Sequence, residues 1–182
     1  MNKRSIVKAI TGLACVTLLA GCAATVERSE VAGRGPATSV PAAASGLVTL
    51  NMVLDPQHPR DAGWQKFRQE WYDIVSEQAQ AKGLRFATQE GEPKPTGEAG
   101  TLMIVKVHDY RHVGIGARVA FGIFTGNAFI DASVELQDLG TGTSFSEHQY
   151  NTSSSAGHGV FAAVTPKQIY AITDEVLAQI KR

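Results

Sequence analysis

Apolar and polar residues alternate along the segment 47–54, which places Val48, Leu50, Met52 and Leu54 on one side. A two-residue period is typical of a strand with one buried face, because successive side chains point to opposite sides. The same period recurs over 128–138, where the inward positions are Ile130, Ala132, Val134 and Leu136. We therefore expect two strands that each bury one face.

A helical period follows the first of these strands. Trp64, Phe67, Trp71 and Ile74 recur at three- and four-residue spacing, and Gln78 or Ala79 extends the stripe. Two tryptophans can mark a ligand site, but at this spacing beside Phe67 they are typical of a helix face packed into a core.

A second helix is predicted near the C-terminus. Thr165 and Pro166 are typical of a helix start. Its apolar face consists of Ile169, Ile172, Val176 and Ile180.

The remaining segments complete the predicted sheet. Residues 84–87 form a short strand, and the almost continuously apolar segment 101–107 indicates a central strand covered on both faces. Gly140-Thr141-Gly142 predicts a hairpin turn, after which 144–152 returns as a polar edge strand. The order predicts an α+β fold: one small domain, with a mostly antiparallel or mixed sheet and two helices packed on one face.

The N-terminus predicts export. Lys3 and Arg4 precede an apolar stretch, 9–19, that is shorter than the roughly 20 residues needed to cross a bilayer. A charged start, a short apolar run and small residues at its end are typical of a cleaved signal peptide. The segment then closes as Leu18-Leu19-Ala20-Gly21-Cys22, which resembles the lipobox of bacterial lipoproteins. That resemblance implies acylation of Cys22.

These features divide the chain into three parts. We expect a signal peptide over 1–21, a lipidated N-terminus with a flexible linker over 22–46, and a globular domain over 47–182. The linker is rich in Ala, Ser, Gly and Pro, and would span roughly 25–30 Å as a random coil. Ala23, rather than an aspartate, follows Cys22, which in lipoproteins favours the outer membrane. The domain would then face the periplasm, with acyl chains on Cys22 binding the membrane.

Composition excludes two classes of function. Removing Lys3, Arg4 and Lys8 from the 17 basic residues leaves 14 against 17 acidic ones, a net charge of −3. We therefore expect no nucleic-acid partner, because such partners select a basic face. Cys15 leaves with the signal peptide and Cys22 is acylated, so the mature domain has no thiol for a disulfide or a metal site.

Other candidate chemistry is weak in the sequence. His108 and His112 are four residues apart, but on a strand that spacing separates them by about 13 Å, too far to share one zinc ion. His158 follows several serines without a nucleophile elbow of the G-x-S-x-G kind. Gly114 and Gly116 begin a G-x-G motif that lacks the rest of a phosphate-binding loop. We expect no metal, no cofactor and no enzymatic activity.

The Gly-rich segment 113–130 is the least ordinary part of the chain. It is largely apolar, and Arg118 is its only charge before Ile130. Two interpretations stay open: an inward-folded connection between strands, or an exposed patch that meets a partner. In the second case the candidate partner surface consists of Gly114, Gly116, Arg118, Phe121, Gly122 and Phe124.

Several of these motifs together resemble one family. The segment from Val107-His108-Asp109-Tyr110 through 114–122, the alternating strand, and Asp138-Leu139-Gly140-Thr141-Gly142 resemble the bacterial lipoproteins known as domain of unknown function 4410. The resemblance covers about 47–182 and implies an envelope protein without a defined activity. We expect a non-enzymatic binding or scaffolding protein with an envelope protein partner. The alternative is a self-associating subunit of an oligomeric envelope or export assembly.

Overall fold

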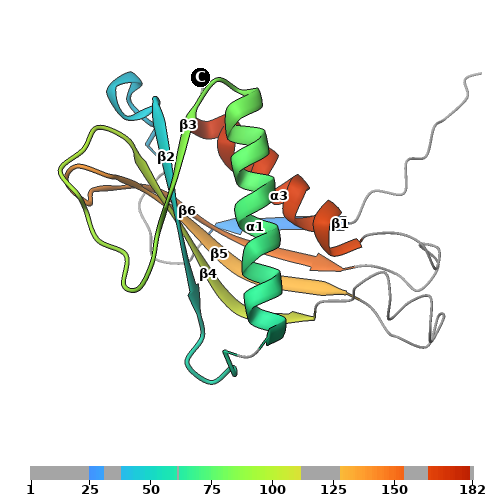
Figure 1. The fold of residues 1–182 in the computed structure, drawn as a ribbon. Coiled ribbons are helices and arrows are strands. Elements are labelled where there is room, and N and C mark those ends of the chain that lie inside the picture. Colours follow the sequence, from blue (N-terminus) through green and yellow to red (C-terminus); the bar gives the residue numbers. More distant parts are fainter. Residues whose placement is uncertain (1–24, 31–37, 61, 112–127, 154–163, 181–182) are drawn as a thin grey trace, which may run out of the picture.

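The computed structural model describes residues 25–30, 38–60, 62–111, 128–153 and 164–180 (Figure 1). Its elements in chain order are β1 (Thr25–Glu30), a short 3-10 helix η1 (Ala42–Ala44), β2 (Leu47–Leu54), α1 (Ala62–Ala81), β3 (Arg85–Gln89), β4 (Thr101–Arg111), β5 (Phe129–Asp138), β6 (Ser144–Ser153) and α3 (Val164–Ile180). The predicted α+β class is confirmed. Among the helices described, none combines the length and apolarity needed to cross a bilayer.

The six strands form one mixed sheet in the order β1-β6-β5-β4-β2-β3. β2 lies parallel to both of its neighbours, β3 and β4. α1 carries the chain back between β2 and β3, and the loop 90–100 carries it back between β3 and β4. The remaining pairs, β4–β5, β5–β6 and β6–β1, are antiparallel. β4 and β5 therefore lie in the middle of the sheet.

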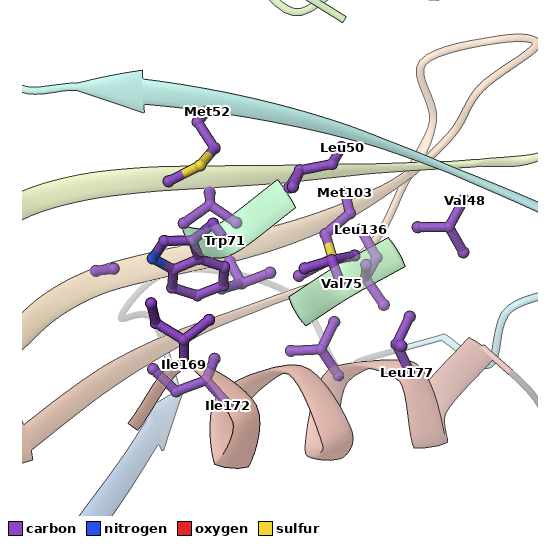
Figure 2. Packing of buried hydrophobic residues seen from close by; sticks show 14 of the residues in the cluster. Val48, Leu50, Met52, Trp71, Val75, Met103, Leu136, Ile169, Ile172 and Leu177 are labelled. Carbon is purple, nitrogen blue, oxygen red and sulfur yellow. The ribbon is translucent and has the colours of Figure 1, made fainter. Parts of the chain in front are cut away.

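Both helices pack on the same face of the sheet (Figure 1). Trp64, Phe67 and Trp71 of α1 are buried, as their helical spacing predicts. The alternating residues of β2 and β5 point to the same side and share this core with α3 (Figure 2). The largest fully buried side chains of this cluster are Trp71, Tyr150, Phe67, Leu50, Leu54, Met103, Ile130, Leu136 and Ile169.

A second, smaller core lies on the opposite face. It consists of Leu47, Leu102, Ile104 and Leu139. The loop between β3 and β4 is joined to this side, because Thr96 N–H donates to the Leu139 carbonyl at 2.8 Å. β4 is therefore covered on both faces over its first half, which confirms the prediction of a central strand.

The hairpin between β5 and β6 is shaped by its polar residues. Asp138 Oδ1 accepts hydrogen bonds from the Gly140 and Thr141 amides, both at 2.8 Å. Gly142 has φ +78°, a left-handed conformation that side chains disfavour. The predicted turn is present, and its side-chain bonds to the main chain hold it closed.

The N-terminal side of the domain differs from the prediction. Residues 25–30, which were assigned to a flexible linker, form β1 and pair with β6 from Thr25↔Ser153 to Glu30↔His148. β6 is consequently an interior strand and not the predicted edge strand. The cause is main-chain pairing: the sequence Thr-Val-Glu-Arg-Ser-Glu carries no apolar stripe, yet its amides and carbonyls complete the open edge of β6.

Candidate functional site

The face of the sheet opposite the helices, which we call the second face, carries a charged cluster. We define this cluster as Lys106, Glu135 and Glu147. Glu135 of β5 lies directly opposite Glu147 of β6 in the strand register. Two like charges in this position repel each other. Lys106 of β4, on the other side of β5, contacts both glutamates: its Nζ is 3.0 Å from Glu135 Oε2 and 3.5 Å from Glu147 Oε1. The lysine therefore compensates two carboxylates at once.

Burial makes this compensation necessary. The side chains of Glu135 and Glu147 are only 4% and 7% exposed, whereas that of Lys106 is 37% exposed. Burial by itself raises the pKa of Glu135, but hydrogen bonds from Gln137, Lys106 and Ser144, together with the Lys106 charge, lower that pKa below its ordinary value. Glu135 is thus ionised and held in place at neutral pH.

A second polar row lies next to the charged cluster. His108 Nε2 is 3.2 Å from Ser133 Oγ, and Gln149 Nε2 donates to Asp131 Oδ1 at 3.2 Å. Ser133 and Glu135 alternate with the apolar core positions, as predicted, but both are buried rather than facing water. Ser133 lies in the middle of a strand, so it lacks the sharp turn that exposes a nucleophilic serine.

A groove of about 520 Å³ lies beside the first turns of α1 and is partly lined by Trp64, Arg68 and Glu90. Arg68 pairs with Glu90, and the Tyr72 hydroxyl donates to Glu90 Oε1 at 3.1 Å. Burial and this hydrogen bond raise the pKa of Tyr72, and the nearby Arg68 charge opposes them. The groove has room for a small ligand. Two of its charged side chains, Arg68 and Glu90, however, already pair with one another.

The candidate residues of the sequence fall mostly elsewhere. Cys22 and the whole candidate partner surface, Gly114, Gly116, Arg118, Phe121, Gly122 and Phe124, lie outside the described residues. So do His112 and His158. Of the other histidines, His58 Nε2 lies 3.2 Å from Asp109 Oδ1, and His148 is buried. Within the described ranges, no group of three metal-ligating side chains comes together.

Sequence reasoning missed the charged cluster. Its three members come from three different strands, and only the register of the sheet brings them together. The available signal was a charged residue in each of three strands near the middle of the chain. Chemically, the cluster offers hydrogen-bond donors and acceptors in fixed positions.

Comparisons with solved structures show distant likenesses to known proteins. No family model and no curated protein matches the chain. A solved structure of a PelC dodecamer from Paraburkholderia phytofirmans is 16% identical and covers 87% of this chain and 97% of its own, with a TM-score of 0.49. A protein of the domain of unknown function 330 family from Xanthomonas campestris is 12% identical and covers 78% and 88%, with a TM-score of 0.40. At these identities and TM-scores, the likenesses carry no argument about what this chain binds.

Proposed function

We propose that this chain is a lipid-anchored protein of the bacterial cell envelope that binds or scaffolds another protein and has no enzymatic activity. The proposal places the acyl chains on Cys22, the anchor in the outer membrane, and the domain in the periplasm. It also places the chain among the lipoproteins of domain of unknown function 4410, which its motifs resemble. A protein in this role needs a fixed position at the membrane and a surface that offers specific contacts.

The observation that carries the proposal is the position of β1. Only Ala23 and Ala24 separate Cys22 from the first residue of β1, Thr25. An extended chain spans at most about 3.6 Å per residue, so an acylated Cys22 would lie within roughly 11 Å of the sheet edge. The domain would then be held close to the bilayer. A flexible linker would instead allow it to move farther from the membrane. Close attachment restricts how the domain is oriented, which suits a scaffold.

The second face supplies a surface for specific contacts. It presents exposed polar residues such as Asn151 beside the buried charged cluster. Hydrogen-bonding groups fixed on a sheet favour recognition of a protein partner through complementary polar contacts. The core face, in contrast, is covered by α1 and α3.

Two measurements test the proposal. Mass spectrometry of the protein purified from its native membrane should show a chain that begins at an acylated Cys22, and Cys22→Ser should release it from the membrane fraction. A photo-crosslinking residue at Asn151 should then capture a partner protein in intact cells, whereas the same residue at the exposed α1 position Gln69 should not. An unmodified Cys22, or crosslinks from Gln69 alone, would contradict the proposal.

A second candidate function is a subunit of an oligomeric envelope assembly. The observation that favours it is the pair of outer strands: β1 and β3 are the two ends of the described sheet, and outer strands are sites where another chain can add. In this case the Gly-rich segment would lie at subunit contacts. The native mass in mild detergent separates the two functions, because a monomer supports the adaptor and a closed oligomer supports the assembly.

A further inference from the structure

The two helices on the core face bury different kinds of residues. α1 buries Trp64, Phe67, Trp71, Val75, Gln78 and Ala79, of which one is polar. Among the side chains of α3 that the structure describes, the buried ones are Thr165, Gln168, Ile169, Ile172, Thr173, Val176, Leu177 and Ile180. Three of these are polar, so α3 brings proportionally less apolar surface to the core than α1 does.

Several polar atoms between α3 and the rest of the domain have no hydrogen-bond partner within the described part of the chain. We call this set the polar seam: Thr165 Oγ1, Gln168 Oε1, Thr173 Oγ1 and Gln179 Nε2 from α3, with Trp71 Nε1 and Gln78 Oε1 from α1. Each atom forms hydrogen bonds with water when α3 is undocked. Burying it without a partner therefore works against docking.

Gln168 Nε2 of α3 donates a buried hydrogen bond to the Ala128 carbonyl at 3.2 Å. The ion pairs of α3, in contrast, lie at its margins. Lys82 Nζ is 2.9 Å from Asp174 Oδ1, and Arg28 is paired with Glu175, but one or both side chains of each pair are well exposed. Exposed ion pairs contribute little to stability. Gln78 donates to the Tyr170 carbonyl at 3.0 Å, which leaves the other side-chain atom of the same residue in the polar seam.

We propose that α3 is a displaceable helix, which undocks from the sheet as a unit while α1 and the central strands stay folded. Local opening of this kind is expected where part of a structure is held by fewer favourable contacts than its neighbours. Undocking restores water to the polar seam and uncovers apolar residues of the core face near β5, which α3 contacts in the docked state. The domain thus has a minor second state in which these core residues are exposed to solvent.

Native-state hydrogen exchange on the full chain tests this proposal. Amides over 168–177 should exchange about tenfold or more faster than those of α1 over 64–79. The free energies of exchange of these α3 amides should share one small dependence on urea concentration, because the helix opens as a unit. Fraying from the C-terminus would instead give a gradient of rates along α3. Such a gradient, or equal rates in α3 and α1, would overturn the proposal.

Valine substitutions provide a matched pair of variants, because valine keeps the shape of threonine and removes only the hydroxyl. Thr173→Val removes an atom of the polar seam and should slow exchange of α3 roughly tenfold, leaving α1 unchanged. Thr101→Val is the control: its hydroxyl is also buried but donates to the Ala44 carbonyl at 2.9 Å, so its loss should lower the free energy of unfolding of the whole domain. If Thr173→Val likewise lowers the free energy of unfolding and speeds exchange of α3, its hydroxyl has a partner, such as a buried water, and the proposal is wrong.

Discussion

Replacing Lys106 with methionine tests whether one cation stabilises the two buried carboxylates of the second face. Methionine keeps an unbranched apolar stem of similar length and removes the charge. Glu135 and Glu147, which face each other across β5 and β6, would then be left with like charges and no compensation from Lys106. We expect the variant to fold and to be less stable at neutral pH.

The magnitude follows from the geometry. A hydrogen bond to a charged group contributes about 1.5–3 kcal/mol, and the Glu135 contact at 3.0 Å qualifies. The Glu147 contact, at 3.5 Å, is at the limit of a hydrogen bond and adds little. Because the Lys106 side chain is 37% exposed, solvent screens its charge. We therefore expect a loss of about 1–2 kcal/mol in the free energy of unfolding.

Acidification should reduce the difference in the free energy of unfolding between the wild type and Lys106→Met. In the wild type the pKa of Glu135 is lowered from its ordinary value of 4.5, so its contribution to stability is present above that pH and is lost as the pH falls through the folded-state pKa. In Lys106→Met, the hydrogen bond and the charge of Lys106 no longer lower the pKa of Glu135. The variant should consequently approach the wild type in stability as the pH falls below 4.5 and through the folded-state pKa of the wild type.

Urea unfolding followed by tryptophan fluorescence measures both effects, because Trp64 and Trp71 are buried in the core. The exposed α1 residue Lys66 provides a control, since Lys66→Met should change stability by less than about 0.5 kcal/mol. Adding Glu135→Gln to Lys106→Met should recover part of the loss by removing a buried charge. A loss below about 0.5 kcal/mol at pH 7, or one that grows on acidification, would refute the reasoning.

Two further predictions concern the core and the β5–β6 turn. Trp71→Ala should lower the free energy of unfolding by about 3–5 kcal/mol, because its side chain is fully buried; a urea-unfolding change under about 1 kcal/mol would mean that α1 packs differently. Asp138→Ala should cost about 1–2 kcal/mol, because the amides of Gly140 and Thr141 lose their acceptor. Asp138→Asn, which keeps a side-chain carbonyl, should retain most of that stability in the same assay.

The sequence predicted the elements in which burial produces a regular pattern of apolar residues. β2, β5 and α1 each bury a face in the main core, which leaves a period of two or of about 3.6 in the chain. The first half of β4 is buried on both faces, which leaves a nearly continuous apolar run. β1 was missed because its contribution is mainly main-chain hydrogen bonding to β6, which almost any sequence can provide. The same omission made β6 an edge strand in the prediction.

The charged cluster was beyond sequence reasoning for a different reason. The alternation of β5 assigns Glu135 to the face opposite the core, and a residue on that side is ordinarily expected to be exposed. The structure buries it, because the centre of the second face is closed by neighbouring side chains on β4 and β6. Which side chains meet across a sheet depends on register, and register is set by turns and bulges that the alternation does not specify.

The pairing of β1 with β6 has a consequence for the order of folding. β1 is synthesised long before β6, the strand with which it pairs. Contacts between such distant segments form slowly, because a long loop must close first. Until then the outer edge of β6 is open to pairing with other chains. We therefore expect a protein shortened to begin after β1 to show an increased tendency to aggregate, even though its hydrophobic core is intact.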